Sequence, residues 1–231
     1  MIGFYNYTVY LTYFSLVISG VGLYLAAGGH PLAALFCLML SGLCDMFDGK
    51  IARTRHKSTE MERNFGIQLD SLADIVCFGV LPAVIGKCFF EEFAEKRNVS
   101  LPCNVLSASH IIVNGIGCLL MLCALIRLAY FNVTEEERQK TTSGCRTSYI
   151  GLPVTTSALI FPMAYAMTYI LARFMPDVVA LYFYAFIMLV VAICFIAPFS
   201  VRKPRGKDLV FIGLFGIAEI VFILFTVKFL R

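Results

Sequence analysis

The first 44 residues of the chain contain no Asp, Glu, Lys or Arg, and the first such side chain is Asp45. Soluble domains carry a charge on about a quarter of their residues, so a water-facing fold does not leave so long a segment uncharged. Over all 231 residues, 15% are charged, 59% are hydrophobic and the mean hydropathy is +0.81. The composition excludes a soluble enzyme, a disordered chain and a secreted disulfide scaffold, and it indicates an integral membrane protein.

Apolar stretches recur along the whole chain at lengths that suit a membrane-spanning helix, which needs about 20 residues. The last stretch is the least regular, because Glu219 near its middle either pairs with a basic residue or marks a break. The sequence therefore predicts an all-α polytopic bundle of about seven transmembrane helices, forming a single integral-membrane domain over residues 1–231. The expected spans lie near 7–28, 31–53, 66–88, 105–131, 150–172, 178–199 and 209–230.

The basic residues are distributed unevenly between the two sides of this seven-span arrangement. Of the 19 Lys and Arg residues, 13 lie on one side and 6 on the other. Basic residues accumulate in cytoplasmic loops, so we expect the richer side to face the cytoplasm, in a protein of the cell membrane. The residues on this side are Lys50, Arg53, Arg55, Lys57, Arg63, Arg127, Arg138, Lys140, Arg146, Arg202, Lys203, Arg205 and Lys207.

Four aspartates lie at the cytoplasmic ends of two consecutive apolar stretches, where an ionised carboxylate is costly. Asp45 and Asp48 are three residues apart, which places them about 60° apart on one face of a helix. Asp70 and Asp74 are four residues apart and about 40° apart on the following helix. Two antiparallel neighbours therefore present two acidic pairs to each other. A single aspartate could simply pair with a base, but four in this pattern are typical of a functional site.

Four clustered carboxylates cannot all stay ionised in a low-dielectric site without counter-charge. Protonation and basic partners are two solutions, but Lys50 and Arg53 are too few to balance four acids. Hard divalent cations are the third, and a pair of them could hold a pyrophosphate and stabilise a phosphorus-centred transition state. Gly49 and Ala52 beside the acids, and Gly66 on the facing stripe, leave room for a bulky ligand. Arg53 is placed to contact its phosphates.

Together these residues form the pattern Asp45-x2-Asp48-Gly49-x2-Ala52-Arg53-x12-Gly66-x3-Asp70-x3-Asp74. The pattern resembles the defining motif of the CDP-alcohol phosphotransferase family, integral membrane enzymes of phospholipid synthesis, and all eight fixed residues match. The interval between Arg53 and Gly66 is longer than in many members. The likeness covers roughly residues 6 to 200, so it implies a six-helix core to which the last span is an addition.

The resemblance also implies roles for the motif residues. Members bind Mg²⁺ or Mn²⁺, here as two divalent ions, through the first three motif aspartates, and the fourth, Asp74, completes the acidic set. In the family the fourth aspartate, here Asp74, is regarded as the base that takes the proton of the acceptor hydroxyl. A hydroxyl is a poor nucleophile at neutral pH and needs such a base. The residues expected around the nucleotide and pyrophosphate of CDP-diacylglycerol are Asp45, Gly49, Ala52, Arg53 and Gly66.

Three passages carry a closer likeness to members whose acceptor is L-serine: 65–80, 127–132 and 151–153. They imply transfer of a phosphatidyl group from CDP-diacylglycerol to the serine hydroxyl, with release of CMP. We expect Arg127 and Asn132, at the end of the fourth span, to lie at the acceptor site. Arg127 would contact the serine carboxylate or the lipid phosphate there, although it could equally be a positive-inside anchor. The likeness further implies a homodimer among membrane lipids, and no nucleic-acid partner is expected.

Two other functions remain open at this point. The same chemistry with glycerol 3-phosphate or an inositol phosphate as acceptor would require more basic residues, because those acceptors bring an additional phosphate. Intramembrane acids on paired helices could also form a divalent-cation or proton transporter. A transporter needs polar groups that reach both sides of the membrane, whereas the four aspartates cluster at one side.

Overall fold

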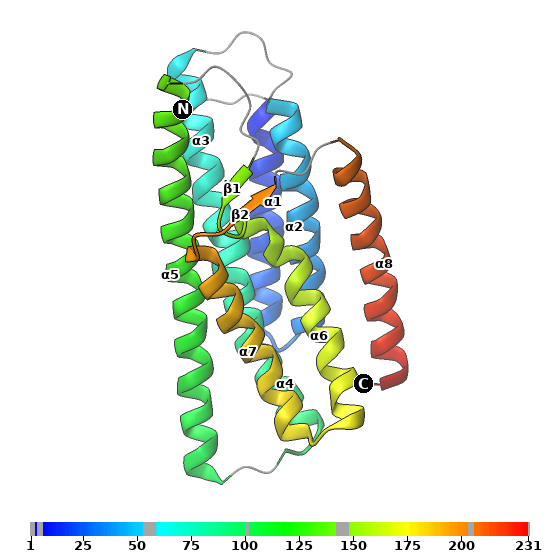
Figure 1. The fold of residues 1–231 in the computed structure, drawn as a ribbon. Helices are drawn as coiled ribbons and strands as arrows, with labels where there is room; N and C mark the ends of the chain where they lie inside the picture. The colour runs from blue at the N-terminus through cyan, green and yellow to red at the C-terminus, as the bar shows by residue number, and fades with distance from the viewer. Residues whose placement is uncertain are drawn as a thin grey trace.

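The computed structural model of the chain describes residues 3, 7–52, 59–99, 102–141, 148–202 and 206–230. Its long helices run side by side, with a short two-stranded ribbon at the edge of the bundle (Figure 1). In chain order the elements are α1 (Tyr7–Ala27), α2 (Pro31–Ala52), α3 (Glu60–Asp74), the π-helix η1 (Ile75–Val80), α4 (Leu81–Lys96), α5 (Cys103–Thr141), β1 (Ser148–Ile150), the 3₁₀-helix η2 (Val154–Thr156), α6 (Ser157–Phe174), α7 (Asp177–Ile196), β2 (Ser200–Arg202) and α8 (Gly206–Leu230).

Every expected span corresponds to a helical column, which confirms the all-α membrane bundle. Within the residues whose side chains the structure describes, the apolar part of α2 is Pro31–Phe47. Among the described residues, six helices are long and apolar enough to cross a membrane: Val9–Ala27, Glu60–Lys96, Cys103–Arg138, Val154–Phe174, Asp177–Ile196 and Val210–Phe229.

The half of the bundle farther from the motif is filled by aromatic side chains of α4, α6 and α7. The ring centroid of Phe89 lies 4.7 Å from that of Tyr165 and 4.9 Å from that of Tyr184, and all three side chains are buried. Such pairs stabilise a core beyond the area that they bury. Phe89 is about four helical turns from Asp74 along the same column, so this core holds the helices together without entering the acidic end.

The third column, α3 to α4, begins at a capping box. Thr59 Oγ1 accepts a 3.2 Å hydrogen bond from the Glu62 N–H, and the Thr59 N–H donates to Glu62 Oε2 at 3.0 Å. Because these contacts satisfy N–H groups at the helix start, α3 begins at Glu60. The sequence predicts a start near residue 66, which is too late.

The π-helix η1 follows Asp74 directly. Pro82, just beyond it, lacks an N–H and so cannot donate to the carbonyl of Phe78 four residues earlier, which favours a widened turn here. Ser157 Oγ, in the first turn of α6, donates a 3.2 Å hydrogen bond to that carbonyl. Ser157 is fully buried, so this bond fastens the start of α6 to the column immediately after Asp74.

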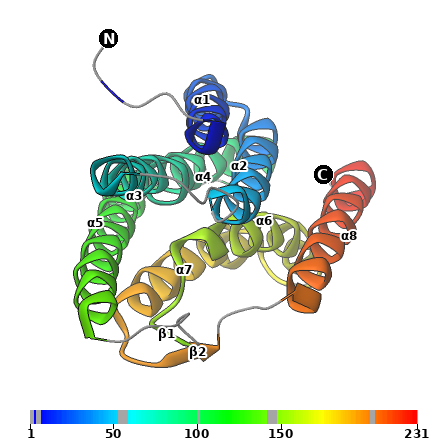
Figure 2. The same ribbon diagram turned by 90° about the horizontal axis from the view of Figure 1, so that it is seen from above.

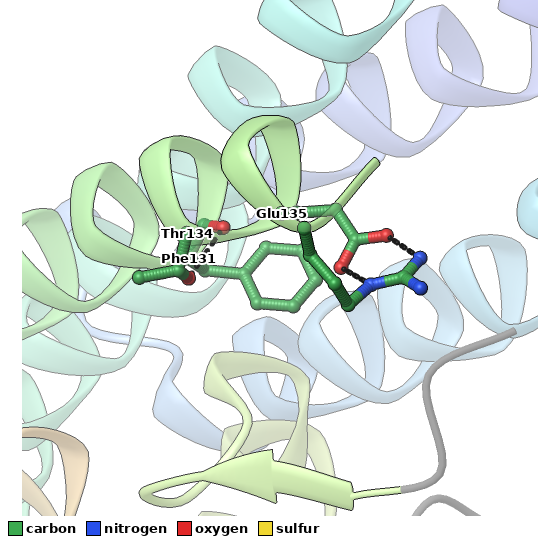
Figure 3. A network of polar contacts seen from close by, with 4 residues as sticks. Phe131, Thr134 and Glu135 are labelled. Carbon is green, nitrogen blue, oxygen red and sulfur yellow. Dashed lines mark hydrogen bonds and ion pairs between the residues drawn. The ribbon is translucent and has the colours of Figure 1, made fainter. Parts of the chain in front are cut away.

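Helix α5 is 39 residues long and continues to Thr141, ten residues beyond the end of the expected span at 131. Glu135 and Arg138 stabilise the extension by a two-point ion pair, with Nε–Oε2 at 3.0 Å and Nη2–Oε1 at 2.6 Å. Figure 3 shows the Glu135 carboxylate in this pair, beside Phe131 and Thr134. Pairs at this spacing support an exposed helix, and they carry α5 past the predicted membrane boundary.

The ribbon joins two segments that are far apart in the sequence. β1 and β2 run antiparallel, with Ser148 opposite Arg202 and Ile150 opposite Ser200. Nothing in the sequence predicts it, since three residues are too few for an alternating pattern. It connects the chain before α6 with the chain after α7.

Helix α8 lies at the rim of the bundle beside α6 (Figure 2). It runs without interruption through Glu219, so the predicted alternative of a break is wrong. The Glu219 side chain is 1% exposed, and within the described residues it has no ion-pair partner.

Candidate functional site

Three of the four predicted aspartates converge at one end of the bundle. Asp45 comes from α2, Asp70 and Asp74 come from α3, and each offers a carboxylate oxygen within 4.8 Å of those of the other two. All three side chains are partly buried. Carboxylates this close repel one another unless a positive charge lies between them. Oxygen donors at this spacing suit a hard divalent cation.

The remaining motif positions are described in part. Asp48, Gly49 and Ala52 belong to the last turns of α2, but their side chains, and the whole of Arg53, lie outside the described residues. Gly66 lies one turn before Asp70, and a Cβ built there would meet no atom of the described residues within 4 Å. The acidic face of α3 is therefore open beside the aspartates, as close approach of a bulky ligand requires.

Asn132 lies against the acidic helix. Its Nδ2 donates a 2.8 Å hydrogen bond to the Oγ of Ser71, the residue that follows Asp70. Ser71 Oγ donates in turn to the carbonyl of Ile67 at 3.1 Å. The predicted acceptor residue is thus beside the acidic cluster. Asn132 contacts the acidic helix through Ser71, a residue that the sequence analysis does not single out.

Arg127 lies in the interior of the bundle. Its side chain is 7% exposed, its Nε donates to the carbonyl oxygen of Leu152 at 3.2 Å, and its guanidinium carbon lies 5.6 Å from the ring centroid of Phe131. A positive-inside anchor would reach the membrane–water interface. The burial of Arg127 therefore favours the site over the anchoring alternative. Tyr130, three residues later on the same helix, is instead 51% exposed.

A cluster of buried hydroxyls lies one turn inside Asp45. Ser41 Oγ is 2.7 Å from Ser19 Oγ and donates to the carbonyl of Ser15 at 3.1 Å. Ser15 Oγ is 3.6 Å from Cys77 Sγ in η1. Hydrogen bonds between transmembrane helices hold them together where no water competes. The cluster joins α1, α2 and η1 beneath the acidic end. Its serines escape prediction because each one resembles a small packing residue.

The acidic cluster lies within the part of the chain that matches a known family. Residues 5–197 match the family model described as CDP-alcohol phosphatidyltransferase. The chain belongs to this family. The match covers α1 to α7 and ends before β2 and α8, so the extra span expected beyond the family core is confirmed.

Several relatives are similar to the chain over most of the bundle. A CDP-diacylglycerol–serine O-phosphatidyltransferase of Saccharomyces cerevisiae is 38% identical over 141 residues, which are 60% of this chain and 44% of the relative. An archaetidylserine synthase of Methanothermobacter thermautotrophicus is 29% identical over 78% of this chain and 62% of the relative. A CDP-diacylglycerol–serine O-phosphatidyltransferase of Helicobacter pylori is 26% identical over 63% and 51%. The chain therefore spans about half the length of these relatives.

Proposed function

We propose that the protein transfers a phosphatidyl group from CDP-diacylglycerol to the hydroxyl of L-serine in a metal-dependent reaction that yields phosphatidylserine and CMP. The observation that carries this proposal is the convergence of Asp45, Asp70 and Asp74 within 4.8 Å, at the motif positions of a member of this family. The choice of serine is supported by the names of the yeast and bacterial relatives.

The acidic cluster would hold Mg²⁺ or Mn²⁺, as a pair of ions, because its ligands are carboxylate oxygens. Bound ions of this kind neutralise the pyrophosphate and the departing CMP. The aspartates assigned to the metal are Asp45, Asp48, Asp70 and Asp74. The residues assigned to the nucleotide and pyrophosphate are Asp45, Gly49, Ala52, Arg53 and Gly66, and the open face at Gly66 supports this.

Asp74 is assigned as the general base. A serine hydroxyl is a poor nucleophile at neutral pH, and a carboxylate within hydrogen-bond reach accepts its proton as the new bond forms. The serine oxygen bonds to the phosphorus that carries the diacylglycerol, and the bond from that phosphorus to the bridging oxygen of the pyrophosphate breaks. CMP leaves with the electron pair, and the proton passes to Asp74. Asp74 ends α3 one turn deeper than Asp70, which supports a role at the lipid side of the site.

Arg127 and Asn132 are assigned to the acceptor. Serine brings a carboxylate, and a guanidinium matches a carboxylate with two parallel hydrogen bonds. The burial of Arg127 within the bundle and the contact of Asn132 with Ser71 support this assignment.

The reaction is assigned to the cytoplasmic face of the cell membrane, on the side with 13 of the 19 basic residues. The family resemblance supports a homodimer as the functional assembly. Lipids of the surrounding bilayer then supply CDP-diacylglycerol directly from the membrane plane.

The acceptor is tested by incubating the purified full chain with labelled CDP-diacylglycerol and Mg²⁺, together with serine, glycerol 3-phosphate or an inositol phosphate. Separation of the lipids is expected to show labelled phosphatidylserine in the serine reaction only. A labelled product with another acceptor would replace serine in the proposal. No lipid product with any acceptor, combined with cation or proton flux into vesicles that contain the protein, would favour the transporter.

A further inference from the structure

Gly151 occupies a turn in which a side chain does not fit. Its φ of +76° lies in the left-handed region, which favours glycine. A Cβ built there would lie 2.9 Å from the carbonyl oxygen of Phe195, 3.3 Å from that of Ala197 and 3.4 Å from Nε of Arg127. The turn therefore approaches both the end of α7 and the Arg127 side chain as closely as a bare backbone allows.

Backbone hydrogen bonds hold this turn against the segment after α7. The Gly151 N–H donates to the carbonyl of Phe199 at 2.6 Å, and the Leu152 N–H donates to the carbonyl of Cys194 at 3.1 Å. The ribbon ends beside the turn, with Ile150 opposite Ser200. The direction of the Leu152 carbonyl is thus set by the ribbon and the end of α7.

That carbonyl orients Arg127. It accepts a 3.2 Å hydrogen bond from Nε, while the ring of Phe131 lies 5.6 Å from the guanidinium carbon. A carbonyl and an aromatic face are both favourable neighbours of a buried cation. The two contacts fix the plane of a guanidinium that is almost entirely removed from solvent.

Two contacts of α5 show how deep Arg127 lies. A Cβ at Gly79 in η1 would meet the Cβ of Ala124 at 3.3 Å, and Asn132 bonds to Ser71 in α3. Because α5 runs antiparallel to the α3–α4 column, the residues between Ala124 and Asn132 lie level with the junction of α3 and η1. Arg127 is one of them, so it lies at the depth of the acidic cluster.

The segment that follows the turn completes this side of the site. η2 packs against α2, α5 and η1 at once, and Val154 within it is buried. η2 thus lies among α2, which carries Asp45, α5, which carries Arg127, and η1, which directly follows Asp74.

We propose that Gly151 is a positioning residue that acts through Arg127 and prepares its guanidinium to bind the carboxylate of the acceptor. This inference rests on the proposed function and deepens it, because it names the backbone turn that orients the guanidinium assigned to the serine carboxylate. The ribbon and the end of α7, far from the motif in sequence, then determine how well the acceptor binds.

The test is a double-mutant cycle with Gly151→Ala and Arg127→Ala in the full chain. Each single variant is expected to raise the KM for serine about tenfold or more, with kcat and the KM for CDP-diacylglycerol within about twofold of their original values. In the Arg127→Ala background, Gly151→Ala is expected to add nothing, since residues that act as one unit are not additive.

Gly29→Ala is the matched control. Gly29 also has a positive φ, of +80°, but a Cβ there would meet no atom within 4 Å. It shares the backbone strain without the contact to Arg127, so its KM for serine is expected to stay unchanged.

Three results would overturn the inference: additive effects in the cycle, an unchanged KM for serine in Gly151→Ala, or a rise confined to the KM for CDP-diacylglycerol. If Gly151→Ala does not accumulate as folded protein, Phe131→Leu removes the opposite contact and leaves the turn intact. Phe131→Leu is expected to raise the KM for serine in the original chain but to have no further effect in the Arg127→Ala background. An unchanged KM for serine in Phe131→Leu would also reject the inference. Failure of the original chain to use serine would instead reject the proposed function.

Discussion

The Nδ2 of Asn132 donates a 2.8 Å hydrogen bond to the Oγ of Ser71, which lies between the two aspartates of α3. The two residues are 61 positions apart in the sequence, and the bond connects α5 with α3. Together with the packing of α3 against α1, it restrains the rotation of α3 about its axis, and that rotation determines whether Asp70 and Asp74 face Asp45. The geometry of the acidic cluster therefore depends on α5 as well as on the motif itself.

Removing this bond is expected to lower turnover moderately. Ser71→Ala deletes the partly buried hydrogen bond from Asn132, worth about 1 kcal/mol, and we expect kcat to fall about fivefold as the aspartates lose their alignment. Ser71→Ala combined with Asn132→Ala is expected to be no worse than Asn132→Ala alone. Thr134→Ala is the control, because Thr134 bonds only carbonyls of its own helix in the described contacts. Additive losses would show that the bond does not link the two residues functionally.

Asp74→Asn tests the base. The amide keeps the size of the side chain but cannot accept the proton, so we expect kcat to fall at least about 100-fold. Binding of CDP-diacylglycerol, measured by equilibrium titration, is expected to remain. Asp208→Asn, in the first turn of α8, removes an acid outside the cluster and is expected to leave kcat unchanged. A variant at position 74 with more than about a tenth of the original kcat would contradict the assignment.

Metal removal tests the acidic cluster as a whole. Chelation with EDTA is expected to abolish turnover, and Mg²⁺ or Mn²⁺ is expected to restore it. Asp45→Asn removes one of the three converging carboxylates, so the Mg²⁺ concentration for half-maximal rate is expected to rise about tenfold or more. Glu95→Gln, an exposed acid at the other end of the column, is expected to leave that concentration unchanged. Full activity in the presence of the chelator would exclude a metal-dependent reaction.

Ser157→Ala is expected to destabilise the bundle. It leaves the buried carbonyl of Phe78 without its hydroxyl donor, which costs about 1–3 kcal/mol and lowers the temperature of thermal inactivation. Pro82→Ala supplies an N–H four residues after Phe78, so Ser157→Ala is expected to cost less in that background. An equal loss in both backgrounds would show that the missing proline donor is not the reason for the bond.

Helical spacing predicts that Asp70 and Asp74 share one face of α3, and the antiparallel order of neighbouring spans predicts that this face lies level with Asp45. The convergence of the three carboxylates agrees with both predictions. Positions three or four residues apart share a helix face wherever the helix lies. The sequence does not predict the depth of Arg127, because an arginine at the end of an apolar stretch is equally compatible with an interfacial anchor and with a buried position. Only the packing of the Leu152 carbonyl and the Phe131 ring around it distinguishes the two.

The π-helix and the ribbon escape prediction for a related reason. Pro82 indicates a missing donor, but whether the chain kinks, widens or ends there depends on Ser157, 75 residues later. Gly151 indicates a turn, but its close contacts are with Phe195 and Ala197 after α7. The π-helix and the turn at Gly151 both depend on contacts between residues far apart in the sequence, and the local sequence pattern does not reveal such contacts.

The central claim is tested most directly by the release of CMP from CDP-diacylglycerol by the purified protein in detergent, with Mg²⁺ and with or without L-serine. The proposed function predicts that CMP and phosphatidylserine appear in equal amounts, that both require serine and the metal, and that Asp74→Asn forms neither at an appreciable rate. CMP release that does not respond to serine, or no release by protein that retains its helical structure, would contradict it.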